Sequence, residues 1–289
     1  MAKFVFELPT DSVEFFEDDL LAVGMYKLHE DSCARQGRIA FLERREEDTI
    51  WERTGQVELN GGLLDMKWKR DGWVAATSED VSLGTTNRIR TARTLDSGIN
   101  LCVDVKAEDI FISTSTGNIF QLDGDLTEKA SWKAHDMETW CVSALQEEHM
   151  VATGADDFSL KLWDTRDTCA PAAISKSHQA GVCSVVPLEE HLIATGSYDK
   201  QLRIFDLRNI RQPLSSVSFS SGVWRIKRSG DRLLLGCMHD GFHIVDWKSA
   251  AKLWHYPSGS LAYGCSWSAN GLFTAGASFY DCAVNIFNA

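Results

Sequence analysis

Two segments of the chain share one pattern: Gly154-Ala-Asp-Asp-Phe-Ser-Leu-Lys-Leu-Trp163-Asp164 and Gly196-Ser-Tyr-Asp-Lys-Gln-Leu-Arg-Ile-Phe205-Asp206. Each ends in an aromatic residue followed by Asp, and the two ends lie 42 residues apart. A repeat of roughly 40–45 residues that closes on Trp-Asp is typical of a four-stranded propeller blade. The pattern therefore predicts an all-β propeller.

Short alternating segments that match this pattern recur every 37–43 residues along the whole chain. Alternation of apolar and polar residues is typical of half-buried strands. The segments end near residues 41, 83, 120, 163, 205, 245 and 287. Seven such segments predict seven blades, in one domain that covers residues 1–289.

The last of these segments is followed by only two residues, so we expect the final blade to lack a fourth strand of its own. The segment 3–8 (Lys-Phe-Val-Phe-Glu-Leu) precedes the first complete unit and has the composition of a strand. We predict that it pairs in the last blade. A ring closed in this way leaves no sheet edge exposed.

Charge and composition limit the possible partners and compartment. The formal net charge is −12, which disfavours direct binding to nucleic acid or to anionic membranes and suits a basic protein partner. The N-terminal segment resembles no targeting peptide, and no apolar stretch is long enough to span a bilayer. We expect a cytoplasmic protein and, because a closed ring needs no partner, a monomer.

The chain has eight cysteines but no CxxC pair, and we interpret them as reduced thiols. Four of them align with Trp224 at what looks like one position of the innermost strands, and they are listed here: Cys102, Cys141, Cys183 and Cys265. Small apolar side chains suit crowded inner strands. No sequence feature lowers the pKa of a thiol, so we do not favour a cysteine nucleophile.

Two blades repeat a set of His, Asp and aromatic residues with the same spacing. The set comprises His135, Asp157 and Trp163 in one blade and His178, Asp199 and Phe205 in the next. We interpret these residues as structural, because buried polar groups in a repeat need hydrogen-bond partners.

One face of the propeller should collect the loops that enter the innermost strands and the turns between the second and third strands. Loops on a rigid scaffold commonly carry function. On this face His239 occupies the place that Asp157, Asp199 and Asp281 occupy in other blades. Either Asp240 takes over the structural role of that Asp, or His239 supplies a group that titrates near neutrality.

Other catalytic motifs are absent from the sequence. There is no nucleophile elbow, zinc helix, phosphate-binding loop or dinucleotide fingerprint. His239, Asp240 and His243 are too weak a pattern to indicate a metal. These observations leave a hydrolase without metal or cofactor, or a binding module.

Several segments are more specific than a generic blade. They are Ser177-His-Gln-Ala-Gly-Val-Cys-Ser184, Gly222-Val-Trp-Arg-Ile-Lys227, Cys237-Met-His-Asp-Gly-Phe242, Leu261-Ala-Tyr-Gly264 with Trp267, and Ala277-Ser-Phe-Tyr-Asp281. Together they resemble the WD-repeat diphthine methyl ester hydrolases, also called diphthine methyltransferase homologues. The resemblance covers roughly residues 130–289, and the first three blades match mainly by position.

The resemblance implies hydrolysis of the methyl ester of methylated diphthine on translation elongation factor 2, a step of diphthamide biosynthesis. This substrate carries a trimethylammonium group, which aromatic faces attract. We expect Trp140, Trp224, Tyr263 and Tyr280 to bind it, with Asp240 beside them.

For catalysis we expect His239 to act as general base on a water molecule, Arg225 to stabilise the oxyanion, and Asp281 to orient or replace the base. Because side chains alternate along a strand, Trp224 and Arg225 should not both point into the channel. The alternative is a non-catalytic scaffold or peptide-binding module, in trafficking or degradation complexes, since most propellers of this type only bind.

Overall fold

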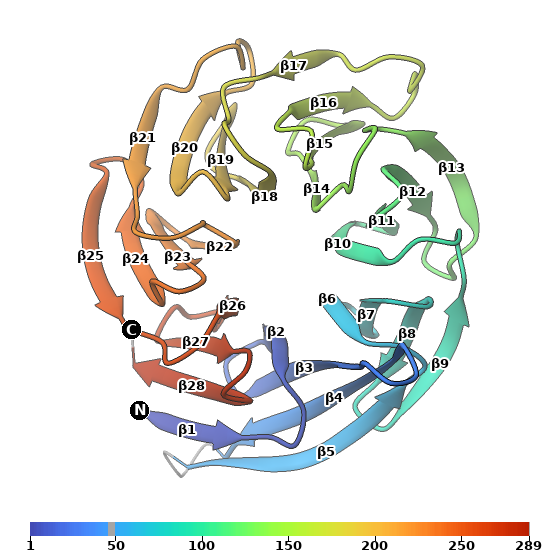
Figure 1. Ribbon diagram of the computed structural model, residues 1–289, viewed down its shortest axis with the longest axis vertical. Coiled ribbons are helices and arrows are strands. Elements are labelled where there is room, and N and C mark those ends of the chain that lie inside the picture. Colours follow the sequence, from blue (N-terminus) through green and yellow to red (C-terminus); the bar gives the residue numbers. More distant parts are fainter. Residues whose placement is uncertain (46–49, 289) are drawn as a thin grey trace.

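The structure, a computed structural model that describes residues 1–45 and 50–288, contains seven antiparallel four-stranded sheets around one axis (Figure 1). Each sheet is one blade, and its strands are numbered first to fourth from the axis outward. The predicted seven-bladed all-β propeller is confirmed. No helix among these residues is long and apolar enough to cross a bilayer.

Blades 1 to 6 are each built from four consecutive strands. The bounds are β2 (Thr10–Phe16), β3 (Leu20–His29), β4 (Ala34–Arg44) and β5 (Trp51–Leu59); β6 (Leu63–Lys69), β7 (Gly72–Thr77), β8 (Val81–Thr85) and β9 (Arg88–Arg93); β10 (Asn100–Lys106), β11 (Asp109–Thr114), β12 (Asn118–Leu122) and β13 (Glu128–Lys133); β14 (Cys141–Ala144), β15 (Met150–Gly154), β16 (Leu160–Asp164) and β17 (Ala173–Ser175); β18 (Val182–Pro187), β19 (Leu192–Ser197), β20 (Gln201–Asp206) and β21 (Ser215–Ser218); β22 (Arg225–Ser229), β23 (Arg232–Gly236), β24 (Phe242–Asp246) and β25 (Ala251–Tyr256).

Blade 7 joins the two ends of the chain. It consists of β26 (Ala262–Trp267), β27 (Phe273–Ser278), β28 (Ala283–Asn288) and β1 (Ala2–Val5). Ala2 pairs with Ile286 and Val5 with Ala283, so the N-terminal strand closes the ring as predicted (Figure 1). The paired segment is shorter than the predicted 3–8, because pairing with β28 ends at Val5. Pro9, which has no N–H to donate, stands just before β2.

Apolar side chains fill the space between neighbouring blades. The second strands are buried on both faces, and five of the six residues of β19 are fully buried. At the seam between blades 7 and 1, Leu21 and Val23 of β3 pack in one cluster with Val284 and Ile286 of β28. Burying both faces of a strand requires a near-continuous apolar run, which explains the Val-, Ala- and Leu-rich second strands.

The first strands around the axis are irregular at their start. The pairing of first and second strands shifts register near Asp11, Leu64, Leu101, Cys183 and Tyr263, in five of the seven blades. Such a bulge places two residues of one strand opposite a single residue of its partner and turns an additional side chain toward the axis. These positions shape the site described below.

Candidate functional site

The loops that enter the first strands and the turns between second and third strands share one face, which we call the entry face. In blade 5 the Gln179 N–H donates to Asp199 Oδ2 at 2.9 Å, and in blade 6 the Ser220 N–H donates to Asp240 Oδ2 at 3.0 Å. In blade 7 the Tyr280 N–H donates to Ser260 Oγ at 3.0 Å. These bonds tie each loop to its turn and fix the rim of the channel.

A small cavity lies where the axis opens on this face, and we call it the mouth cavity. Its volume is about 40 Å³, and its lining comes from six blades: Asp11, Leu64, Leu101, Cys102, Trp140, Cys183, Trp224 and Arg225. A cavity needs roughly 10–15 Å³ of this kind of volume to hold one water. The mouth cavity therefore has room for a water or a methyl-sized group.

Trp224 and Arg225 both line the mouth cavity, so the expectation that alternation separates them is wrong. Arg225 pairs with Gly236, and the Trp224 N–H donates to the carbonyl of the same Gly236 at 2.9 Å. Two consecutive residues thus oppose one, as in a β-bulge, and the strict period of two is lost. The bulges also correct the predicted alignment of four cysteines with Trp224. Cys102, Cys141 and Cys265 occupy the paired position that Arg225 occupies in blade 6, rather than that of Trp224. Cys183 lies one residue before that position, as Trp224 does.

Aromatic side chains form a continuous arc above the mouth cavity. Trp224 is at its centre, with ring centroids 5.3 Å from Trp140, 5.5 Å from Tyr198 and 5.0 Å from Tyr263. Tyr263 continues to Phe279 at 5.3 Å, and Phe279 to Tyr280 at 5.0 Å. The four predicted cage residues are thus joined in one arc, through Phe279 in the case of Tyr280. We call these six residues the aromatic arc.

The exposure of the arc decreases toward the axis. Tyr280 is 72% exposed, whereas Trp140, Tyr198, Trp224 and Tyr263 are half-buried. The Trp140 Nε1–H donates to Asp156 Oδ1 at 2.8 Å, which fixes this indole at the wall of the cavity. The arc therefore offers aromatic surface that is partly open to solvent and held in place from behind.

Arg225 reaches across the channel to blade 2. Its Nη1–H donates to Asp65 Oδ1 at 2.5 Å and its Nη2–H to the Leu64 carbonyl at 3.2 Å. Burial works to raise the pKa of Asp65, but the charges of Arg225, Lys67 and Lys227 and the hydrogen bond from the Val103 N–H together outweigh it and hold that pKa below its ordinary value. A larger cavity of about 380 Å³ lies further down the channel, and both Arg225 and Asp65 line it. Arg225 lines the mouth cavity as well, so the ion pair lies between the two cavities.

Asp11 provides a second carboxylate at the mouth. Its residue surface is 6% exposed, and burial raises its pKa to about 7 even though Arg225 acts in the opposite direction. The neighbouring Gly264 makes room for this strand, since a Cβ there would lie 2.7 Å from the Asp11 carbonyl oxygen. The site thus contains a buried acid that ionises near neutral pH.

The predicted base His239 lies in an exposed position on the turn between β23 and β24. Asp240 has taken over the structural role at this turn: it accepts the Ser220 N–H as Asp199 accepts that of Gln179, and its carboxylate lies 3.2 Å from His243 Nε2. Asp281 is exposed and accepts a hydrogen bond from Ser278 Oγ at 2.7 Å. Neither His239 nor Asp281 lines the mouth cavity, so the structure does not bring them together with Arg225 there.

The residues interpreted as structural form a full network in blade 4. His135 Nδ1 is 2.8 Å from Asp157 Oδ2 and its Nε2 is 2.7 Å from Thr153 Oγ1, which also accepts the Trp163 Nε1–H at 3.0 Å. In blade 5, where Phe205 replaces Trp, His178 keeps only the bond to Thr195 at 2.9 Å, and Asp199 accepts from Arg203 instead. Burial lowers the pKa of His178 to about 4, so this ring is neutral.

The eight cysteines form no disulfide with one another. Burial raises the pKa of the channel thiols Cys102, Cys141, Cys183 and Cys265, and it does the same for Cys237. Because the thiolate is the nucleophile, these environments suppress rather than activate the thiols.

One group of side chains has the composition of a metal site. Ligand atoms of Asp240, His243 and His255 lie within 4.8 Å of one another, and the two imidazole rings stack at 4.2 Å. His243, however, stands where Lys161 and Arg203 stand in blades 4 and 5, and those two residues pair with Asp157 and Asp199. We therefore interpret the group as the blade 6 version of a structural ion pair.

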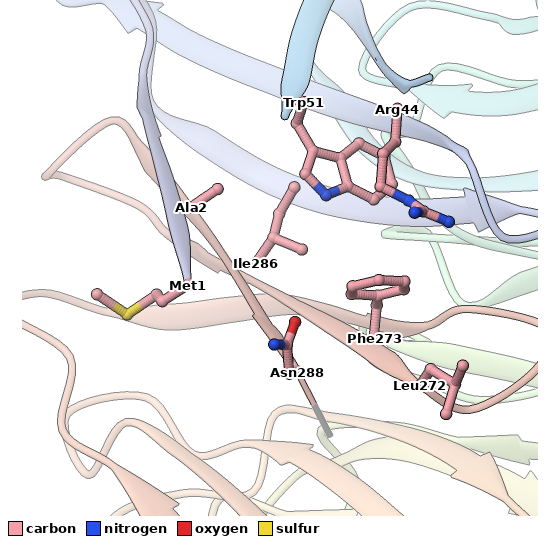
Figure 2. A pocket seen from close by; sticks show the side chains of 8 residues that line it. All are labelled: Met1, Ala2, Arg44, Trp51, Leu272, Phe273, Ile286 and Asn288. Carbon is pink, nitrogen blue, oxygen red and sulfur yellow. The ribbon is translucent and has the colours of Figure 1, made fainter. Parts of the chain in front are cut away.

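A larger cavity of about 580 Å³ lies at the closing seam of the ring, away from the channel (Figure 2). Its lining combines the N-terminal residues Met1 and Ala2 with Trp51, Phe273 and Ile286, and with Arg44, whose guanidinium lies 4.9 Å from the Phe273 ring centroid. None of the predicted site residues lines it. This apolar groove results from blade closure and carries no group suited to catalysis.

Comparison with known proteins agrees with this architecture. The family model "WD domain, G-beta repeat" matches residues 126–164 and 170–206, which contain β13 to β16 and β17 to β20, so each matched repeat begins with the outer strand of the preceding blade. Diphthine methyltransferase from Mus musculus is 42% identical, over 91% of this chain and 68% of that protein. The chain belongs to the diphthine methyltransferase family.

Other relatives extend the similarity over nearly their whole length. A diphthine methyltransferase homolog from Dictyostelium discoideum is 29% identical, with 96% of each chain covered, and the Schizosaccharomyces pombe diphthine methyltransferase is 28% identical over 94% of this chain and 92% of that one. The WD40 propeller domain of Doa1 superposes with a TM-score of 0.86 at 13% identity, over 99% of this chain and 95% of that one. At that identity the likeness shows the fold alone.

The structure places three residues at the site that the sequence pattern did not reveal: Tyr198, Phe279 and Asp11. Tyr198 and Phe279 stand beside turn residues, and an alignment by turn position rather than by strand could have found them. Asp11 precedes the first recognisable repeat unit, in a segment with no Trp-Asp phrase. No sequence signal pointed to Asp11 as a site residue.

Proposed function

We propose that this protein hydrolyses the methyl ester of methylated diphthine on translation elongation factor 2, in the pathway to diphthamide. The relatives are named for diphthine, which supports an enzyme of diphthamide biosynthesis. The observation that carries the proposal is the aromatic arc at a channel mouth that also holds Asp11 and Arg225. A cation-binding wall next to ionisable groups is what this substrate requires.

The arc suits the trimethylammonium group of the substrate. A quaternary ammonium cannot donate hydrogen bonds, and aromatic faces attract it by about 0.5–2 kcal/mol each, depending on desolvation. Trp224 and its neighbours Trp140, Tyr198 and Tyr263 are half-buried, so their free faces are partly shielded from water. Such a wall would hold the cation and direct the ester, which lies beside it in diphthine, toward the axis.

Ester hydrolysis further requires a base, a water molecule and a group that stabilises the oxyanion. Arg225 is held at the mouth cavity by Asp65, and among the described residues it is the only Arg or Lys that lines this cavity. His239 and Asp281 lie on exposed turns of the entry face, from which they could act only on a part of the substrate that stays outside the cavity.

The charge of the entry face supports a basic protein partner. Its turns carry Asp156, Asp199, Asp240 and Asp281, and the whole chain has a net charge of −12. Complementary charge accelerates association more than it increases affinity. A basic surface around the modified histidine of the factor would therefore be guided to the mouth.

The test is to incubate the purified protein with elongation factor 2 that carries methyl-esterified diphthine. We expect release of methanol and a loss of mass equal to one methylene group, and a Trp224→Ala variant should react more slowly at low substrate concentration. Binding without release of methanol would identify the protein as a non-catalytic scaffold and refute the proposal.

A further inference from the structure

The Asp11 side chain is mostly buried and has no protein partner, but its carboxylate oxygens keep some accessible surface at the mouth cavity. Asp11 is 6% exposed and lines the mouth cavity, yet none of the hydrogen bonds or ion pairs found among residues 1–45 and 50–288 involves its side chain. Buried carboxylates in folded proteins are normally paired or hydrogen-bonded, because desolvation of an unpaired charge is costly. A carboxylate that is kept unpaired at a cavity indicates a function there.

The surroundings of Asp11 come from the strands that pack against β2 and from β22, which contributes to the same cavity. Arg225 of β22 and Asp65 of β6 act on it electrostatically, and its own charge acts on Tyr263 of β26. Cys102 and Cys183 face it across the cavity, while its pairing partner β3 contributes only Met25 and Gly24 near this position. Burial therefore has the largest effect on when Asp11 is charged, the Arg225 guanidinium opposes it, and the Asp65 carboxylate adds to it.

We propose that Asp11 is the general base of the ester hydrolysis, activating a water molecule in the mouth cavity while Arg225 stabilises the oxyanion. This inference rests on the proposed function. The cavity has a volume of about 40 Å³, and Asp11, Arg225 and Trp224 all line it. Base, oxyanion site and cation-binding wall thus border one space, which has room for the attacking water while the body of the substrate stays outside it, against the aromatic arc.

The step balances as follows. The Asp11 carboxylate takes one proton from the water, the water oxygen bonds to the ester carbon, and the carbonyl electron pair moves to the oxygen beside Arg225. When that pair returns, the bond to the methoxy oxygen breaks and protonated Asp11 gives its proton to the leaving methoxide. The products are methanol and a carboxylic acid, which loses its proton to solvent.

The protonation behaviour of Asp11 agrees with this role. Burial raises its pKa to about 7, and a general base works best when its pKa lies near the operating pH. A base of this pKa is protonated and inactive below pH 7 and ionised above it. kcat/KM for the esterified factor should therefore rise through about pH 7 and then level off.

The test compares Asp11→Asn with the wild type and with Asp104→Asn, which removes a different channel carboxylate, one that lines the larger cavity below the Arg225–Asp65 pair. We expect Asp11→Asn to lower kcat for methanol release about 100- to 10,000-fold, with KM changed less than about threefold and the pH step lost. Asp104→Asn should stay within about threefold of the wild type. Asp11→Ala is the second variant, and thermal unfolding shows that each protein is folded.

The possible results separate the two proposals. The role of Asp11 is overturned, and the proposed function stands, if the wild type is active and the activity of Asp11→Asn lies within about fivefold of it. An unchanged pH step in Asp11→Asn has the same meaning. The same holds if His239→Ala loses activity while Asp11→Asn keeps it. A wild type that binds the esterified factor and releases no methanol refutes the proposed function itself.

Discussion

Replacement of Arg225 by Met should destabilise the protein strongly, because it leaves Asp65 charged and buried without its guanidinium partner, with only the Val103 N–H still donating to the carboxylate. The Asp65 side chain is 2% exposed and that of Arg225 15% exposed, and they meet at 2.5 Å across the channel. Removal of one member of such a pair costs about 3–5 kcal/mol. With about 2.1 cal/mol/K of unfolding entropy per residue, the whole chain has roughly 0.6 kcal/mol/K, and the melting midpoint should fall by about 5–8 °C.

The effect should depend on pH in a defined direction. In the wild type the pKa of Asp65 is held below 3.8, so the pair contributes stability that is fully present above pH 4 and is lost as the pH falls further. Without Arg225, burial is opposed only by Lys67, Lys227 and the Val103 N–H, so the pKa of Asp65 rises from its wild-type value, and that of Asp11 rises as well. Protonation then relieves the unpaired charges, so the loss of stability should be largest near pH 8 and shrink toward pH 5.

Thermal unfolding at pH 5, 6.5 and 8 measures both effects. The double variant Arg225→Met, Asp65→Leu removes the buried charge and should regain most of the lost stability. Arg208→Met serves as the matched control, since it removes an exposed Arg–Asp pair at 2.6 Å and should hardly shift the midpoint. A shift for Arg225→Met below about 2 °C, or one that is equal at pH 5 and pH 8, would refute the reasoning.

Two further predictions concern the arc and the scaffold. Trp224→Ala removes the ring that contacts Trp140, Tyr198 and Tyr263. Calorimetry should show that this variant binds the esterified factor about 10- to 30-fold more weakly than the wild type, and that Trp224→Phe has an intermediate affinity. Equal affinities would contradict a cation-binding role. His135→Ala removes the hydrogen bonds of this ring to Asp157 and to buried Thr153, which keeps only the Trp163 Nε1–H, and should cost about 2–3 kcal/mol in denaturant unfolding. Its activity well below the melting midpoint should be normal, and a loss there would argue against a structural role.

The sequence was sufficient for the fold because the blade pattern is local. The Trp-Asp phrase, the apolar second strands and the spacing of 37–43 residues each report on one blade, and closure follows from counting them. The closing strand was also recognisable from its composition, although its pairing stops at Val5 rather than Leu8. Side-chain patterns within a strand predict its burial well when both of its faces are covered by neighbouring blades.

The candidate site was harder to predict because local irregularities decide it. Alternation would have separated Trp224 from Arg225, but both oppose Gly236. Counting residues equated His239 with Asp199, but the blade 6 turn has a different backbone. In blade 5 only Lys200, the residue after Asp199, has a positive φ, whereas in blade 6 both Met238 and Gly241 do. That shift gives the structural role to Asp240 and leaves His239 exposed. Such shifts of one residue leave no trace in composition or period.

The geometry of the mouth depends on the whole ring rather than on any one blade. Asp11 belongs to blade 1, Asp65 to blade 2 and Arg225 to blade 6, so their relative positions are set only when the ring is closed. Closure in turn requires β1, which pairs with β28. The chain continues from β1 directly into β2, the strand that carries Asp11. A site assembled in this way is held rigidly, which is what the stabilisation of an oxyanion by a fixed cation requires. It follows that a change in β1, more than 200 residues away from Arg225 along the sequence, can alter the mouth without touching it.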